Sequence, residues 1–219
     1  MSGKSIFHLI LIPSLVTLAV TMIRVAGEML HGPELLFNRE SGAVGITWLA
    51  FLVAVYFAVR LQNAGEGPAR PGRAVALTAL SLGVAIGGNL LLFPVGQGKG
   101  NSLALAGGMA ICIASLYVMR AGWPAYGNAM IAYAVAARVP VAVISAAAVY
   151  GSWGTHYDTG PSDMRMYVWP NWVEKWVGIA LLPQIFFWIP FTVSFCGLFG
   201  AVTAALRKRR APAPAVSAG

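Results

Sequence analysis

The sequence predicts an all-α polytopic membrane protein, a bundle of six transmembrane helices with both termini in the cytoplasm. Of its 219 residues, 58% are hydrophobic and only 10% are charged, whereas a soluble domain carries about 25% charged residues to hydrate its surface. The mean hydropathy is +0.72, and the apolar residues gather in six runs separated by polar segments. This composition excludes a disordered chain, a secreted disulfide scaffold and an ordinary soluble enzyme.

The first three helices follow from apolar runs that end at polar or helix-breaking residues. A helix is expected at about 5–30, because its apolar run is longer than the roughly 7 to 15 residues of a signal-peptide core. The second helix is expected at about 44–61, ahead of a polar loop that contains Gly and Pro. In the third, at about 74–95, Gly83, Gly87 and Gly88 would let a neighbouring helix approach closely.

The remaining helices are expected at about 102–120, 126–150 and 173–206. At 1.5 Å per residue the last of these would reach roughly 50 Å, well beyond a hydrocarbon core of about 30 Å. It must therefore tilt, kink or begin outside the core. Pro183 and Pro190 are the expected kink sites, because proline removes a backbone donor and clashes with the preceding turn.

The distribution of charge predicts the orientation of the bundle. Of the 15 basic residues, nine fall on the side of the termini, five on the opposite side, and Arg138 lies within a helix. The positive-inside rule then places both termini in the cytoplasm. All acids except Glu66 fall on the outer side. Residues 207–219 are expected to form a basic and then disordered cytoplasmic tail.

Several functional classes lack support in the sequence. A net charge of +8 would suggest nucleic acid in a soluble chain, but in a membrane protein it reports orientation, so no nucleic-acid partner is expected. Cys112 and Cys196 lie in apolar runs and are expected to be buried thiols. CxxC, HExxH, GxSxG and Walker-type motifs are missing from the sequence, and no cofactor is predicted. The lipid bilayer is the expected partner.

Arg138 is the most informative single residue, because it lies near the middle of the fifth expected helix. A guanidinium at that depth costs about 3 kcal/mol on insertion scales, so it should face the bundle interior. It would either brace the bundle or attract a small polar or anionic ligand. Glu28 is the nearest candidate partner, although Arg24 and Glu28 share a helix face at i, i+4 and a pair between them is the simpler interpretation.

Polar residues on the outer side form a second group of candidates. His156 and Asp158 lie two residues apart after the fifth helix, and His31 follows the first. His156 could act as a base oriented by Asp158, or the group could bind a divalent metal. Because H-x-D is common by chance, loop-stabilising hydrogen bonds are favoured and no metal site is predicted. Asn89 requires an interior partner, which an interhelical hydrogen bond would supply. The catalytic candidates are His156 and Asp158, and the binding candidates are Arg138, Glu28, Asn89 and His31.

Three segments resemble uncharacterised bacterial multi-pass inner-membrane proteins, over most of the chain. They are the run from Ala137 to Pro140, the run from Gly154 to Asp158, and the run from Leu182 to Gln184. The resemblance implies the topology and a location in the bacterial inner membrane. It implies no activity, cofactor or substrate.

Three functions stay open at this point. The preferred one is a transporter or a protein that binds a small solute or lipid headgroup at an outward-facing polar site, built from the outer ends of the first, third and fifth helices. A membrane-embedded enzyme would instead use His156 with Asp158 or Glu28. An accessory or assembly subunit, in an oligomer or a membrane complex, would use its polar residues for structure only. A close-packed outer face, without a cavity joining Arg138 to His156, would favour the subunit.

Overall fold

The computed structural model describes residues 3–38, 45–96, 101–159 and 168–210. Within those ranges the regular structure is entirely helical, with no strand, so the predicted all-α class is confirmed. Five helices are long and apolar enough to cross a membrane. The predicted disordered tail lies outside the described residues from 211 onward. So do five charges that the sequence analysis assigns to the outer side: Arg39, Glu40, Lys99, Asp163 and Arg165.

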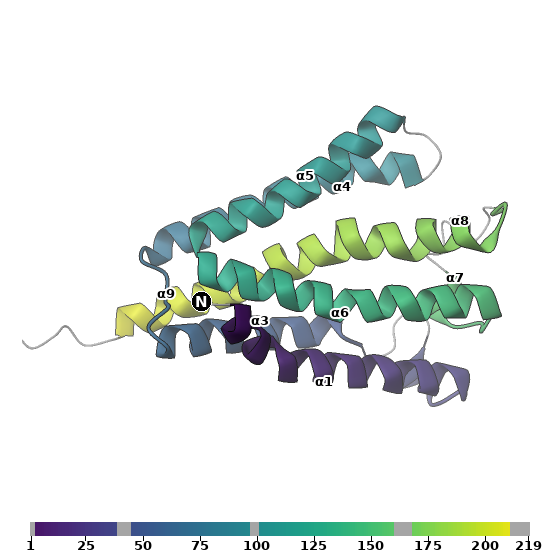
Figure 1. Cartoon of the computed structure of the whole chain (residues 1–219), viewed down its shortest axis with the longest axis horizontal. Coiled ribbons are helices and arrows are strands. Elements are labelled where there is room, and N and C mark those ends of the chain that lie inside the picture. The colour runs from purple at the N-terminus through teal and green to yellow at the C-terminus, as the bar shows by residue number, and fades with distance from the viewer. Residues whose placement is uncertain (1–2, 39–44, 97–100, 160–167, 211–219) are drawn as a thin grey trace, which may run out of the picture.

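The long helices lie roughly along the long axis of the molecule and form a bundle that includes the last one (Figure 1). Two of them begin at proline, earlier than the sequence predicts, because proline fits the first turn of a helix, where its missing N–H has no partner to lose. The helix α3 has 17 residues and falls short of the length expected of a spanning helix. The bounds are α1 Gly3–Met29, α2 Glu34–Phe37, α3 Thr47–Asn63, α4 Pro71–Gly96, α5 Ser102–Gly122, α6 Pro124–Gly151 and α7 His156–Thr159.

Residues 172–210 form one continuous helix, called here the last helix. It starts as α8 (Trp172–Trp176), passes through three π-helical segments and ends as α9 (Gly197–Arg210). Pro183 and Pro190 each lie two residues after the end of a π-helical segment, so the carbonyl four residues before each proline lies within that segment. A π-helical turn is wider than an α-helical turn, which relieves the clash between a proline ring and the preceding carbonyl. The two predicted kink sites thus coincide with changes in helix type. The three segments are Val177–Leu181, Gln184–Trp188 and Phe191–Cys196.

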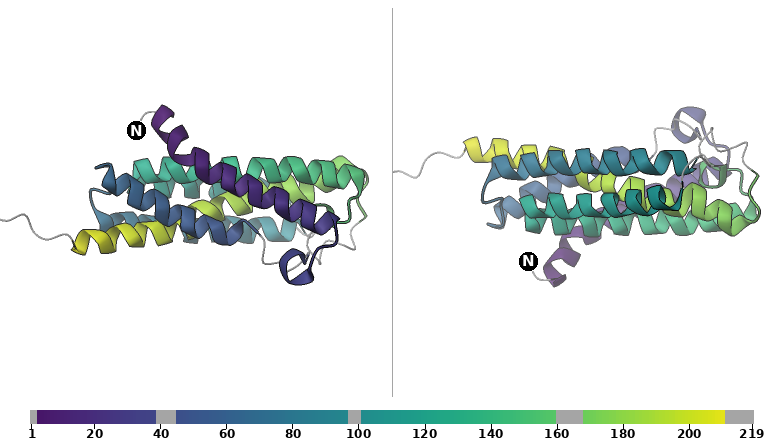
Figure 2. Two further views of the ribbon diagram at one scale, coloured as in Figure 1. Left: turned by 90° about the horizontal axis from the view of Figure 1, so that it is seen from below. Right: turned by 90° about the horizontal axis from the view of Figure 1, so that it is seen from above.

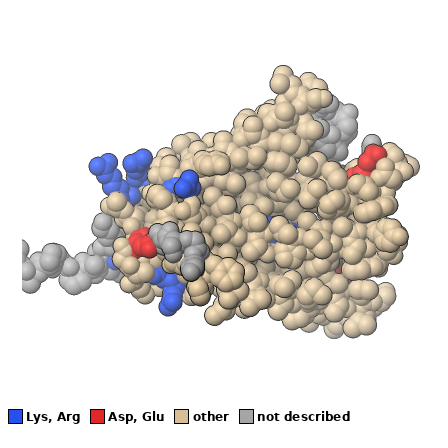
Figure 3. All heavy atoms as spheres, in the orientation of Figure 1, with Lys and Arg blue, Asp and Glu red and all other residues tan. Residues whose placement is uncertain are grey.

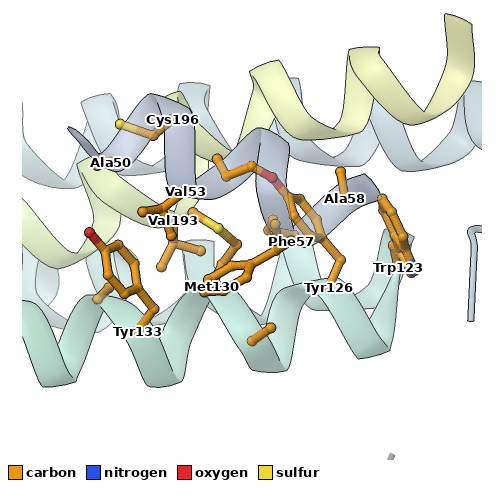
Figure 4. Packing of buried hydrophobic residues seen from close by; sticks show 14 of the residues in the cluster. Ala50, Val53, Phe57, Ala58, Trp123, Tyr126, Met130, Tyr133, Val193 and Cys196 are labelled. Carbon is orange, nitrogen blue, oxygen red and sulfur yellow. The ribbon is translucent and has the colours of Figure 1, made fainter. Parts of the chain in front are cut away.

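The core lies where α6 meets α3 and the last helix. Phe57 of α3 packs edge-on against Tyr133 of α6, and Val193 of the last helix lies beside them (Figure 4). The hydroxyl of Tyr126 donates to the carbonyls of Ala54 and Gly197, at 3.2 and 3.0 Å, which joins three helices at one point. Cys112 and Cys196 are buried free thiols, as predicted.

The helix α1 crosses α6 obliquely on one face of the bundle (Figure 2). The side-chain hydroxyl groups of Thr17 on α1 and Tyr133 on α6 are joined by a hydrogen bond of 2.8 Å. On the opposite face of α1, Ile12, Leu15 and Ile23 are each more than half exposed. Apolar side chains of this kind fit the hydrocarbon of a lipid bilayer, where exposure carries no cost.

The helices α4 and α5 approach closely through glycines. A methyl group added at Gly88 would lie 2.6 Å from Cys112 Sγ and 3.0 Å from the carbonyl oxygen of Gly108. Gly88 thus has the packing role that its sequence pattern predicts. A methyl group added at Gly83 or at Gly87 would meet nothing within 4 Å, so the predicted close approach is wrong at these two positions.

Gly88→Ala is therefore expected to destabilise the protein by about 1 to 3 kcal/mol, because overpacking forces the two backbones apart. Gly87→Ala is the matched control, and it should be neutral or stabilising, since Ala has the higher helix propensity. Thermal unfolding of both variants in detergent checks the difference. Equal melting temperatures for the two variants would contradict the close approach.

Candidate functional site

At the end of the bundle where α1 ends and α7 lies, called here the acidic end, Arg24 and Glu28 of α1 lie close to His156 of α7. Arg24 Nε donates to Glu28 Oε1 at 2.8 Å, which is the i, i+4 pair expected from the sequence. The backbone N–H of His156 donates to Glu28 Oε2 at 2.8 Å, and His156 Nδ1 lies 2.5 Å from Glu28 Oε1. Glu28 is 7% exposed. A buried carboxylate is thus satisfied by a basic side chain of its own helix and by a residue 128 positions away.

Asp158 builds the turn that presents His156. Its Oδ1 accepts from the backbone N–H of Thr155 at 2.6 Å and from the Thr155 hydroxyl at 2.9 Å. Its Oδ2 accepts from the Gly154 N–H at 3.0 Å. Gly154 has a φ of +69°, a left-handed conformation that glycine adopts without strain. The carboxylate of Asp158 serves the loop, and the residue that orients the imidazole is Glu28.

The Glu28–His156 pair has the geometry of an oriented imidazole. With Nδ1 held by a carboxylate, the other ring nitrogen, Nε2, is left to accept or donate a proton. The side chain of His156 is 31% exposed, so water reaches it. Burial raises the pKa of the neighbouring Tyr157 phenol above its usual value, so that phenol stays protonated. Within the described part of the chain, no hydroxyl or thiol hydrogen-bonds to the imidazole.

Arg138 lies on α6, 13 residues before its end at Gly151, or roughly 20 Å along the helix axis. It is 5% exposed. Its guanidinium carbon stacks 4.7 Å from the centre of the Trp188 ring, and Nη2 reaches the Thr192 hydroxyl at a long 3.4 Å. Its Nε is buried without a hydrogen-bond partner. In the ranges the structure describes, Arg138 forms no ion pair, with Glu28 or any other acid.

Asn89 links α4 to its neighbours in the interhelical manner expected from the sequence. Its Nδ2 donates to the carbonyl of Ala85 at 2.9 Å and to that of Phe186 in the last helix at 3.3 Å. It also lies 3.5 Å from Cys112 Sγ. These contacts occupy the amide N–H groups, so Asn89 ties helices together and is not grouped with Arg138 or Glu28.

The candidate residues thus fall into separate places. Glu28 and His156 are joined, Asp158 supports their loop, and Arg138 faces the last helix much deeper in the bundle. His31 is exposed in the turn after α1, with a φ of +52°. Among the described residues, no group of three or more His, Cys, Asp and Glu side chains could hold a metal ion.

Sequence reasoning missed Gln184, an amide within the apolar run of the last helix. Its Oε1 is buried without a hydrogen-bond partner. Gln184, Trp188 and Thr192 follow each other at i, i+4 and i+8. Because residues four apart lie on one side of a helix, Gln184 is placed one turn beyond the two residues that contact Arg138. Placing a side-chain amide in a membrane-spanning run costs free energy, and this cost could have identified Gln184 from the sequence.

No known protein family, curated protein or solved structure matches the chain.

Proposed function

We propose that the protein is a transporter or binding protein of the bacterial inner membrane that holds a small polar or anionic ligand, such as a lipid headgroup, beside Arg138. The observation that carries the proposal is the guanidinium itself, 5% exposed and with Nε unpartnered. An arginine with a purely structural role inside a bundle is expected to direct its five N–H donors to carbonyl groups or to an acid. Here the contacts are one aromatic ring and one long hydrogen bond.

Gln184 extends this polar site toward the acidic end of the bundle. Its unpartnered Oε1 can accept a hydrogen bond, and Arg138 Nε can donate one. A ligand that carries an anionic oxygen and a hydroxyl or amine would satisfy both atoms. Gln184 and Trp188 lie in one π-helical segment of the last helix and Thr192 lies in the next, and π-helical turns are frequent at functional sites.

The proposal includes six spans, with α3 as the sixth and shortest, and both termini in the cytoplasm. Lys and Arg side chains gather at the end of the bundle where the last helix finishes (Figure 3). By the positive-inside rule that end would face the cytoplasm, and the ligand would enter from the acidic, outer end. At 1.5 Å per residue α3 is about 25 Å long, which a bilayer accommodates by local thinning.

The alternatives have less support. An enzyme would have a base in His156, oriented by Glu28, but the described residues place no nucleophile against it. An accessory subunit would need no unpaired guanidinium inside its own bundle, because an unpaired charge costs stability without serving a structure.

The test uses Trp188 as the reporter, because its ring lies against the guanidinium. Purified protein would be titrated with inorganic phosphate, benzoate and dihexanoyl phosphatidylglycerol, and the fluorescence of a Trp188→Phe variant subtracted. We expect a saturable change with at least one anion. Arg138→Leu should weaken binding by at least roughly tenfold, since a hydrogen bond to a charged group contributes about 1.5 to 3 kcal/mol. Arg138→Lys should lie between, because it keeps the charge and loses the planar fork.

Val139→Leu is the matched control, since Val139 is the exposed neighbour of Arg138 on α6. It should bind as the wild type does. Undiminished binding by a folded Arg138→Leu protein would overturn the proposal, and so would a wild type whose Trp188 responds to none of the three anions.

A further inference from the structure

The end of the bundle where the last helix finishes, called here the basic end, contains an open cavity that the proposed function does not use. It has a volume of about 410 Å³ and lies between the loop from α3 to α4 and the junction of α5 with α6. The lining residues include Glu66, Arg70, Arg73, Trp123 and Ala125. Figure 3 shows Lys and Arg side chains clustered at this end.

The cavity is held in shape by Trp123. Its indole N–H donates to the carbonyl of Glu66 at 2.7 Å, which fastens one wall to the other. The indole also stacks on Tyr126, with the ring centres 4.6 Å apart. Trp123 is buried. A wall made of a buried, hydrogen-bonded indole exists before any ligand binds, and preorganisation of this kind lowers the cost of binding.

Two cations at the cavity have no partner of their own. Arg70 and Arg73 are exposed, and neither guanidinium forms an ion pair or a hydrogen bond within the ranges that the structure describes. Arg70 immediately precedes α4, Arg73 lies in its first turn, and both residues line the cavity. The other wall is the start of α6, whose first turn has no capping side chain. Its free N–H groups add to the positive potential that the arginines set up.

We propose that this cavity binds a phosphate group, with Arg70 and Arg73 as its cationic ligands. Guanidinium groups match phosphate oxygens in pairs, and basic pockets between helices at the cytoplasmic face of membrane proteins take anionic lipid headgroups. The phosphate can belong to an anionic lipid of the adjoining leaflet or to a soluble phosphoryl compound. The site lies at the opposite end of the bundle from Glu28 and His156 and shares no contact with Arg138.

The experiment compares lipid and soluble phosphate on the same protein. Full-length protein would be reconstituted in nanodiscs of phosphatidylcholine with a graded fraction of phosphatidylglycerol, and retained phosphatidylglycerol counted by native mass spectrometry. In parallel, inorganic pyrophosphate would be titrated against the melting temperature in phosphatidylcholine alone. The variants are Arg70→Gln/Arg73→Gln and the matched control Arg60→Gln. Arg60 lies at the same end, on α3, where it stacks on Tyr56 outside the cavity.

We expect the double variant to bind roughly tenfold more weakly or worse, because each basic residue near an anionic headgroup surface contributes about a fivefold factor. Arg60→Gln should retain wild-type binding. A preference for phosphatidylglycerol assigns the site to lipid, and stabilisation by pyrophosphate alone assigns it to a soluble compound. Equal loss in Arg60→Gln, or no response to either probe, would overturn the proposal. Both cavity arginines are exposed, so the double variant should fold, which its unchanged melting temperature without ligand would verify. Repeating the measurement with Arg138→Leu separates this site from the one beside Arg138.

Discussion

Arg138→Met is expected to raise the free energy of unfolding by about 1 to 4 kcal/mol while it abolishes ligand binding. The guanidinium is buried, its Nε is unpartnered, and its hydrogen bond to Thr192 is long. Replacing a buried ion pair by apolar side chains of similar volume is often stabilising by about 1 to 4 kcal/mol, and a buried charge without an ion-pair partner has less to offset its desolvation. Methionine is unbranched and flexible, so it can fill the space that the arginine stem leaves beside Trp188.

The measurement is the apparent melting temperature in detergent, compared at one heating rate because membrane proteins commonly unfold irreversibly. Val139→Met at the exposed neighbouring position is the control and should change little. The opposite result, a loss of about 2 kcal/mol or more, would mean that Arg138 braces α6 against the last helix. The proposed binding role would then lose its main support.

Glu28→Ala is expected to destabilise the acidic end by about 2 to 3 kcal/mol. The carboxylate accepts from Arg24 Nε and from the backbone N–H of His156, and it contacts His156 Nδ1. Removing one member of a fully buried pair costs about 3 to 5 kcal/mol. The cost is lower here because the side chains of Arg24 and His156 are 14% and 31% exposed and can be hydrated.

Hydrogen exchange can locate this effect as well as measure it. The amides of α7, and above all that of His156, should exchange faster in Glu28→Ala, because they lose their attachment to α1. Glu34→Ala is the control, since Glu34 is an exposed acid at the same end of the molecule. If both variants changed exchange in α7 equally, the contact between Glu28 and His156 would not be what holds the loop.

The features that sequence could predict are those set by composition and by local spacing. Scarcity of charge predicts the helical membrane class, and the i, i+4 rule pairs Arg24 with Glu28. The apolar surroundings of Cys112 predict a buried thiol. Each of these depends on residues close together in the chain, so no knowledge of the packing is needed.

Features that depend on contacts between distant segments escaped prediction. His156 is two residues from Asp158 and 128 from Glu28. Even so, Asp158 accepts hydrogen bonds from its own loop, and it is Glu28 that contacts the imidazole. Local spacing cannot decide between two carboxylates, because the choice depends on which of them the packing of α1 against α7 brings to the imidazole. The Trp188 contact of Arg138 likewise follows from the way α6 and the last helix pass each other. A search of the sequence for an acidic partner of Arg138 could not find this contact, because the partner is an aromatic ring.

The depth of Arg138 makes the affinity of the proposed site for a charged ligand depend on the transmembrane potential. With α6 across the membrane, a group halfway along it senses about half of the transmembrane potential, or about 1.2 kcal/mol per unit charge at 100 mV. A negative interior would oppose an anion that enters from outside, reducing its affinity by roughly sevenfold in an energised cell. A neutral or zwitterionic ligand would bind with no such dependence. Occupancy of the site by an anion would then follow the energy state of the membrane as well as the concentration outside.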